Sequence, residues 1–258
     1  MRRERLLYNH QESGSVDLLA ADAELERTLE DLSDAKNYSN WIYDLTAPHL
    51  GHRVLEVGAG HGTMTELFIE RAEKVVATDV TERCADLLSA RFSGDPRVDV
   101  MLGKISEAAE HGPFDSAVLI NVLEHIEDDD EALAQLSGLL KPGGRLVLWV
   151  PAFALLYSDF DRRIGHYRRY QRKNLAAQLM RSGYEVVDIR YVNPIGAVGW
   201  FFIARLAKRV PNRRVAMIFD RYLVPVVSRI EKKFRPPFGQ SVFAVAIKTS
   251  DGYNGSTQ

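Results

Sequence analysis

Cysteine is almost missing from this chain, which has one, Cys84, among 258 residues. No disulfide can form within the chain, and a reducing cytoplasmic setting is expected. Long apolar runs are missing too, since no stretch reaches the roughly 18–20 residues that a membrane-spanning helix needs. The opening Met-Arg-Arg-Glu-Arg leads into polar sequence, unlike a signal peptide. We therefore expect a cytoplasmic globular protein, with 46% hydrophobic residues to build its core.

The chain also lacks a Lys/Arg-rich tract and a recognisable nucleic-acid-binding module, so no nucleic-acid partner is expected. Its net charge of −2 conceals an uneven distribution. Residues 151–250 carry 19 Lys and Arg against 6 Asp and Glu, whereas the remainder carries 14 against 29. Three explanations fit: complementary faces of one domain or of a homodimer, attraction of an anionic substrate, or contact with an anionic membrane surface.

Apolar segments with strand and helix character alternate along most of the chain. The segment 114–121 is apolar on both faces, as is typical of a buried strand in a parallel sheet. The alternation predicts an α/β fold, with a parallel sheet covered by helices on both faces. We expect strands at 53–57, 74–78, 98–102, 114–121, 145–150, 184–191 and 241–248. We expect helices at 22–36, from 41 to about 50, at 63–71, from 81, at 128–140 and at 175–182.

The most informative segment is 54–63, Val-Leu-Glu-Val-Gly-Ala-Gly-His-Gly-Thr. An apolar run containing Glu56 leads into Gly58, Gly60 and Gly62, and a helical pattern follows. Glycines there allow a sharp turn and a close approach of the backbone to a ligand. The order of strand, glycine-rich turn and helix indicates a site for a nucleotide-type cofactor. The turn alone is also compatible with a nicotinamide-cofactor fold.

Four motifs together identify a more specific resemblance. They are Glu56–Gly62, Val75–Asp79, Phe114–Ile126 and Leu140–Leu146. In this order and spacing, over roughly residues 50–150, the chain resembles the class I S-adenosylmethionine-dependent methyltransferases. The resemblance implies a doubly wound, Rossmann-like sheet of seven strands, mostly parallel with the last strand antiparallel. It also implies S-adenosylmethionine as cofactor and methyl transfer as the reaction.

The resemblance assigns cofactor contacts by position. Gly58 and Gly60 would pass under the methionine part, and Glu56 would meet its amino group or hold the loop. Asp79 would accept both ribose hydroxyls, because a carboxylate offers two oxygens to a vicinal diol. Lys104 departs from the family, whose members usually carry an acidic residue there. The remaining cofactor-binding candidates are Tyr38, Val80, Gly103, Ile105, Asn121 and Val122.

Two histidines are candidate general bases for a hydroxyl nucleophile. His125 follows the fourth strand, where it acts as the base or orients the loop. His166 lies in the segment after the fifth strand. No spaced set of His, Cys and Asp indicates a metal, and we expect none. The acidic run 128–131 is expected at a helix start, where acids complement the helix dipole.

The segment 157–170, Tyr-Ser-Asp-Phe-Asp-Arg-Arg-Ile-Gly-His-Tyr-Arg-Arg-Tyr, is the candidate substrate-binding region. Relatives place substrate-facing residues at this point of the fold. Arg168 or Arg169 could hold an anionic group. The alternative is a packed lid, in which the arginines pair with Asp159 and Asp161. The substrate-binding candidates are Tyr157, Asp161, Tyr167, Arg169 and Tyr170.

Three regions are expected: an N-terminal helical flap (1–50), a cofactor-binding core (51–192 with 240–250) and a helical insertion or cap (193–239). The insertion keeps helical spacing around Pro225, which predicts a kink or two short helices. Three roles for the insertion stay open: a roof over the substrate, a homodimer face or a membrane-surface helix.

The leading functional hypothesis is methylation of a small-molecule or lipid-like acceptor at oxygen, in natural-product or cell-surface metabolism. The alternatives are a cyclase or rearrangement enzyme on the same fold, and a membrane-surface accessory protein.

Overall fold

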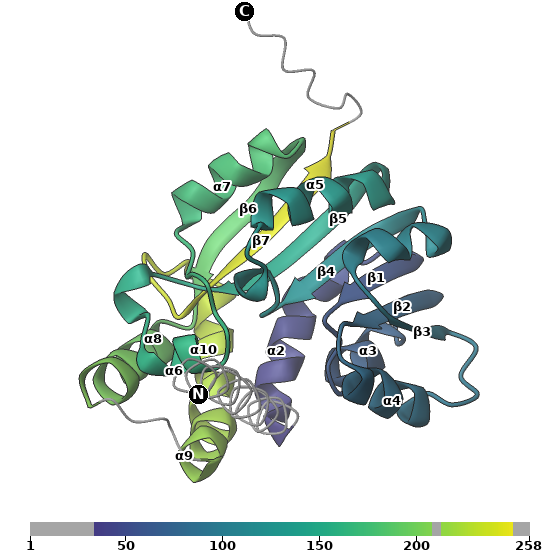
Figure 1. The fold of residues 1–258 in the computed structure, drawn as a ribbon. Coiled ribbons are helices and arrows are strands. Elements are labelled where there is room, and N and C mark those ends of the chain that lie inside the picture. Colours follow the sequence, from purple (N-terminus) through teal and green to yellow (C-terminus); the bar gives the residue numbers. More distant parts are fainter. Residues whose placement is uncertain (1–33, 208–212, 250–258) are drawn as a thin grey trace, which may run out of the picture.

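Seven strands form one continuous sheet in the computed structural model, which describes residues 34–207 and 213–249 (Figure 1). Their order across the sheet is β3-β2-β1-β4-β5-β7-β6. Strands β1 to β5 pair in parallel, whereas β7 pairs antiparallel with both β5 and β6. This confirms the predicted doubly wound fold. The strands are β1 (Arg53–Val57), β2 (Lys74–Asp79), β3 (Val98–Leu102), β4 (Phe114–Ile120), β5 (Leu140–Pro151), β6 (Tyr184–Val192) and β7 (Ser241–Lys248).

Helices cover both faces of this sheet (Figure 1). Two begin with side-chain caps: Thr81 accepts a hydrogen bond from the backbone of Cys84, and Asp128 accepts one from that of Glu131. The α-helices are α2 (Lys36–Thr46), α3 (Thr63–Phe68), α4 (Glu82–Arg91), α5 (Asp129–Leu139), α6 (Asp159–Arg163), α7 (Arg172–Arg181), α8 (Pro194–Trp200), α9 (Arg213–Ile218) and α10 (Val224–Glu231).

The core has two layers because successive side chains of a strand point to opposite faces. In β1, Val54 packs into one layer and Leu55 into the other. The first layer contains side chains from α2, α3, α4 and α10. The second contains side chains from α5 and α7. Burial on both faces explains why β4 is rich in apolar residues and ends in the apolar run 117–120.

Most predicted boundaries lie within three residues of the observed ones, and β1, β3 and β7 match throughout. Strand β5 begins five residues earlier than predicted, because Leu140 already pairs with Phe114 before a shift in register. The helix predicted over 63–71 already ends at Phe68. The helix predicted over 22–36 lies almost wholly outside the described residues.

The insertion between β6 and β7 is helical, as predicted. α8 continues into the π-helical turn η5 (Phe201–Leu206), and a second π-helical turn, η6 (Phe219–Leu223), joins α9 to α10. Pro225 occupies the first turn of α10, where the missing N–H costs little. Within residues 34–207 and 213–249, no helix combines the length and apolar character that crossing a membrane requires.

Candidate active site

The glycine-rich turn joins β1 to α3 and requires glycine in two ways. Gly58, Gly60 and Gly62 have φ angles of +68°, +55° and +76°, which side chains rarely adopt. A Cβ on Gly58 would also lie 2.5 Å from Cγ2 of Val122. The turn therefore packs directly against Val122, two residues beyond the end of β4, and this contact leaves no room for a side chain at position 58.

Glu56 lies beneath this turn and is 4% exposed. The Thr65 hydroxyl donates a hydrogen bond of 2.6 Å to Oε2 of Glu56, which ties β1 to the first turn of α3. Burial raises the pKa of Glu56 to about 8, although the Thr65 hydrogen bond acts in the opposite direction. Of the two predicted roles, the structure displays the one that holds the loop.

Asp79 ends β2 and connects the turn to the second strand. Its Oδ2 accepts a hydrogen bond of 3.0 Å from the backbone N–H of Gly60. Its Oδ1 accepts from the backbone and the hydroxyl of Thr81, at 3.0 and 2.9 Å. Oδ1 thus accepts two hydrogen bonds and Oδ2 accepts one, so Oδ2 keeps a lone pair for a further hydroxyl donor while Asp79 is fixed in place.

Two exposed apolar side chains stand beside this carboxylate at the ends of neighbouring strands. Val80 is 72% exposed, and Leu102 is 47% exposed and lies opposite Asp79 in the β2–β3 register. The backbone of Gly103 donates to the carbonyl of Asp79 at 2.9 Å. Val80 was a sequence candidate, whereas Leu102 was missed because it reads as an ordinary strand residue. Lys104 is exposed and Ile105 is buried.

Strained backbone marks the end of β4. Asn121 has a φ angle of +53°, and its N–H donates to the carbonyl of Trp149 at 2.7 Å. Such a conformation costs free energy outside glycine and concentrates at functional sites. Asn121 and Val122 follow the carboxyl end of β4, and Val122 contacts the turn at the carboxyl end of β1. Ligands of open α/β sheets bind at this edge.

Tyr38 on α2 reaches the same region from the preceding helix. Its hydroxyl accepts a hydrogen bond of 3.2 Å from Nε1 of Trp149 on β5, and the two rings meet edge to face. Burial raises the pKa of Tyr38 to about 12. The start of α2 is fixed by Asp220 of η6, which accepts from the backbone N–H groups of Asn37 and Tyr38. The insertion therefore positions the predicted flap residue.

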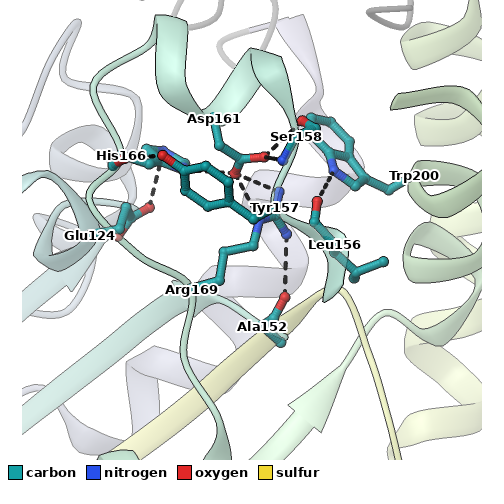
Figure 2. A network of polar contacts seen from close by, with 9 residues as sticks. All are labelled: Glu124, Ala152, Leu156, Tyr157, Ser158, Asp161, His166, Arg169 and Trp200. Carbon is teal, nitrogen blue, oxygen red and sulfur yellow. Dashed lines mark hydrogen bonds and ion pairs between the residues drawn. The ribbon is translucent and has the colours of Figure 1, made fainter. Parts of the chain in front are cut away.

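His166 belongs to a buried polar network that sequence reasoning did not assemble (Figure 2). Its Nδ1 lies 3.0 Å from Oδ1 of Asp161, and its Nε2 lies 3.7 Å from Oε1 of Glu124. Arg169 holds the same Asp161 oxygen with Nε and Nη2, each at 2.7 Å. Burial opposes ionisation of Asp161, but the contacts from His166 and Arg169 outweigh it and lower its pKa to about 2.

Glu124 is completely buried, and neither of its carboxylate oxygens has a hydrogen-bond partner among the residues that the structure describes. Burial raises its pKa to about 8, although the charge of Arg169 favours the ionised form. The His125 ring meets the His166 ring edge to face at 4.5 Å. Burial and the neighbouring His166 lower the pKa of His125 to about 4. Both sequence-predicted histidines thus face one buried carboxyl group.

The remaining substrate candidates form the frame of this network. The hydroxyl of Tyr157 donates to the carbonyl of His166 at 2.7 Å (Figure 2). The hydroxyl of Tyr170 donates to Asp129 at 2.9 Å. The guanidinium of Arg169 is 3% exposed and committed to Asp161, so it matches the predicted lid rather than an anion-binding role. Tyr167 is 54% exposed and remains available to a substrate.

A seven-stranded sheet of this order, with a glycine turn after β1 and a carboxylate ending β2, defines a Rossmann-like cofactor-binding domain. A family model described as "Methyltransferase domain" matches residues 17–189. The chain belongs to this methyltransferase family, of the class I S-adenosylmethionine-dependent group. The resemblance drawn from the four motifs is confirmed, and so is the cofactor of the group, S-adenosylmethionine.

The names of related proteins agree with this membership. The chain is 28% identical over 171 residues to a protein of Mycolicibacterium smegmatis named a probable S-adenosylmethionine-dependent methyltransferase, covering 63% of this chain and 65% of that one. It is 30% identical over 156 residues to a ubiquinone biosynthesis O-methyltransferase of Xanthomonas euvesicatoria, covering 54% and 65%. The chain thus spans slightly less than two thirds of either relative's length.

A solved structure shows the same fold. It is the 1,6-didemethyltoxoflavin-N1-methyltransferase of Burkholderia thailandensis, bound to its substrate 1,6-didemethyltoxoflavin and to S-adenosylhomocysteine. The TM-score is 0.57 with 20% sequence identity, and the alignment covers 93% of this chain and 90% of that one.

Proposed function

We propose that this protein transfers the methyl group of S-adenosylmethionine to a hydroxyl of a small, lipid-like acceptor, and that His166 removes the hydroxyl proton. The observation that carries the proposal is the Asp161–His166 pair. The 3.0 Å contact between Asp161 and Nδ1 of His166 leaves Nε2 of His166 to accept a proton. A carboxylate that holds one ring nitrogen fixes the imidazole for this task.

The residues at the carboxyl edge of the sheet fit the cofactor. The Gly58 turn presents bare backbone, since a Cβ there meets Val122. Glu56 would sit near the methionine amino group, Asp79 would accept the ribose hydroxyls, and the apolar Val80 would flank the adenine. The remaining cofactor contacts that we propose are Tyr38, Gly60, Gly103, Lys104, Ile105, Asn121 and Val122. The cofactor supplies an activated methyl group, so the chain mainly has to align the nucleophile and exclude water.

The side chains must also remove the proton of the acceptor hydroxyl. Asp161 keeps its charge at neutral pH because its pKa is about 2, and it stabilises the imidazolium that His166 becomes. His125, whose pKa is about 4, stays neutral beside it and is the second candidate base. Glu124 offers an acceptor within 3.7 Å of Nε2 of His166. Tyr157 and Tyr170 frame the site, and the exposed Tyr167 would contact the acceptor.

The test is release of S-adenosylhomocysteine with a panel of hydroxylated lipids and small phenols. His166→Gln should lower turnover at least 100-fold, the lower end of general-base effects, with calorimetric binding of S-adenosylmethionine retained. His125→Gln tests the runner-up, and His52→Gln is the control, because His52 is exposed and pairs with Glu73. Normal turnover in His166→Gln would refute His166 as the base. Conversion of a substrate without S-adenosylhomocysteine release would favour the cyclase alternative.

A chelation experiment tests whether Glu124, His125 and His166 act through a bound metal ion instead. One ligand atom each of Glu124, His125 and His166 lies within 4.8 Å of the others, close enough to gather round a metal ion. Under our proposal, turnover survives incubation with EDTA and gel filtration. Loss of turnover that Zn²⁺ or Mn²⁺ restores would instead show that the cluster works through a metal.

The wider role that we propose is methylation of a natural product or cell-surface metabolite in the cytoplasm, with no nucleic-acid partner. The single cysteine agrees with a reducing compartment. The name of the Xanthomonas relative, an O-methyltransferase of ubiquinone biosynthesis, supports an oxygen acceptor on an apolar molecule.

A further inference from the structure

The insertion turns an apolar stripe outward along α9, η6 and α10. The outer stripe consists of Ile218, Tyr222, Val226, Ile230 and Phe234, each four residues after the last. Their exposed fractions are 53%, 61%, 50%, 54% and 60%. Side chains four residues apart are neighbours on a helix surface, so Ile218 to Ile230 follow one another over about 18 Å of helical rise, and Phe234 lies three residues beyond the end of α10. Large apolar side chains rarely line up in the open on a surface with no partner.

The opposite side of the same helices is already packed. Val224 and Val227 are 1% and 3% exposed and belong to the core beneath β5 and β7. Asp220 is buried and accepts hydrogen bonds from the start of α2. Because the inner side of these helices already packs on the core, the outer stripe is not part of the core of this domain.

A second stripe runs along α8 and η5 and consists of Ile195, Val198, Phe202 and Leu206. Their exposed fractions are 43%, 46%, 59% and 58%. The inner side of this segment lies against the residues that follow β5: Nε1 of Trp200 donates to the carbonyl of Leu156 at 3.0 Å (Figure 2). The Trp200 ring also packs against Phe160. Arg169 lies over the same ring at 5.2 Å. Trp200 therefore connects the segment that carries the second stripe to Arg169, which in turn contacts Asp161.

Charge beside the outer stripe is mainly positive, although Lys232 pairs with Asp44 and Arg235 pairs with Asp188. Residues 214–235 contain six exposed cations, Arg214, Arg221, Arg229, Lys232, Lys233 and Arg235. The same range contains two acids. Asp220 is buried, and Glu231 is partly buried and accepts from the backbone of Asn193 at 2.9 Å. A two-fold homodimer through this face would bring like charges together, whereas anionic lipid headgroups would neutralise them.

We propose that the two stripes dock this protein on an anionic lipid surface, with the apolar side chains in the headgroup–acyl boundary and the cations among the phosphates. An apolar face with a cationic flank is the pattern of a helix that lies in a membrane interface. Figure 1 shows α8, α9 and α10 grouped at one end of the molecule, away from α5 and α7. Docking there brings the His166 region to the lipid, which would then be the source of the acceptor. This account of the acceptor's source rests on the proposed function.

The experiment is co-sedimentation of the full chain with phosphatidylcholine vesicles, with and without phosphatidylglycerol in about one third of the lipid. We expect binding only to the anionic vesicles and its loss at high salt. One variant carries Val226→Gln, Ile230→Gln and Phe234→Gln. Its matched control changes three exposed apolar residues outside the insertion: Leu87→Gln, Met180→Gln and Val187→Gln. The first should bind at least about tenfold more weakly, and the second should bind as the unchanged protein does.

A charge pair of variants tests the cations separately. One variant carries Arg214→Gln, Arg221→Gln and Lys233→Gln. It should bind anionic vesicles on the order of 100-fold more weakly, since each cation near an anionic surface contributes about fivefold to the affinity. The control changes three exposed cations elsewhere: Arg71→Gln, Lys173→Gln and Arg181→Gln. All substituted side chains point to solvent, and circular dichroism with S-adenosylmethionine calorimetry establishes that each variant is folded.

Three outcomes would overturn the inference. These are no sedimentation with anionic vesicles, equal binding to neutral and anionic vesicles, or equal loss in variants and controls. A homodimer in light scattering that the apolar variant dissociates, without vesicle binding, would assign the outer stripe to a second copy of the chain. Vesicle binding is measured without turnover. A protein that binds vesicles but releases no S-adenosylhomocysteine keeps the docking surface and loses the proposed function.

Discussion

The contact between Gly58 and Val122 gives a prediction whose magnitude follows from two separate causes. Gly58→Ala places a side chain at a φ of +68°, which costs about 1–2 kcal/mol. It also places Cβ 2.5 Å from Cγ2 of Val122, an overpacking that costs about 1–3 kcal/mol. We expect a total loss of about 2–5 kcal/mol in the free energy of unfolding. Gly94→Ala is the matched control, because Gly94 has a φ of +82° with no atom within 4 Å of the added Cβ.

Urea unfolding of Gly58→Ala, Val122→Ala and the double variant separates the two causes. Val122→Ala removes the methyl groups that the new Cβ meets, but it leaves the backbone strain in place. The double variant should therefore be about 1–3 kcal/mol more stable than the sum of the single effects predicts. Additivity within about 0.5 kcal/mol would refute the steric argument. A loss in Gly94→Ala as large as in Gly58→Ala would refute it as well, since backbone strain would then account for the whole effect.

Three further predictions concern buried charges. Burial raises the pKa of Glu56 to about 8, above its value in the unfolded chain. As the pH rises from roughly 4.5 to 8, this one group should therefore lower the free energy of unfolding by up to about 1.4 kcal/mol per pH unit. Glu56→Gln should remove that contribution in urea titrations across this range. Arg169→Met leaves the Asp161 charge buried without its guanidinium and should cost about 3–5 kcal/mol. Asp220→Ala removes the acceptor at the start of α2; it should cost about 1–3 kcal/mol and weaken S-adenosylmethionine binding in calorimetry through Tyr38.

Exposed counterparts supply the controls. Glu70→Gln should keep the pH slope of the unchanged protein. Arg181→Met and Asp44→Ala each break a solvent-exposed ion pair and should cost less than about 1 kcal/mol. An unchanged slope in Glu56→Gln, or equal losses in a buried variant and its exposed counterpart, would contradict the roles derived from burial.

The sheet could be predicted from the sequence because its signals are local. Apolar runs that end at glycine, aspartate or asparagine mark the strands, and β1, β3 and β7 occupy the predicted residues. Helix ends were harder to predict, because a helix can end wherever packing ends. The helix predicted over 63–71 ends at Phe68, a fully buried side chain on the first-layer core. The sequence also predicted the break at Pro225, though not the π-helical turn before it.

The cofactor contacts that we propose follow from single positions, whereas the His166 network could not be predicted in this way. Gly58 directly follows β1, and Asp79 ends β2. The network joins Glu124 to Asp161 and His166 across 37 and 42 residues of sequence, and no local pattern indicates that Glu124 is completely buried. The interpretation of Asp161 and Arg169 as a paired lid was one of two alternatives. Their 2.7 Å contact favours it, because a guanidinium so engaged and buried does not reach an outside anion.

The insertion connects the features that the core alone leaves separate. Through Asp220 of η6 it fixes the start of α2, and with it Tyr38, whose hydroxyl meets Trp149. Through Trp200 of α8 it supports the loop that carries Asp161 and His166. The same helices turn their apolar stripes to the solvent. A surface that binds these stripes therefore acts on segments that contact both α2 and the residues around the Asp161–His166 pair. Lipid docking should then change the affinity for S-adenosylmethionine as well as the supply of acceptor. By linkage, saturating S-adenosylmethionine should alter vesicle affinity by the same factor.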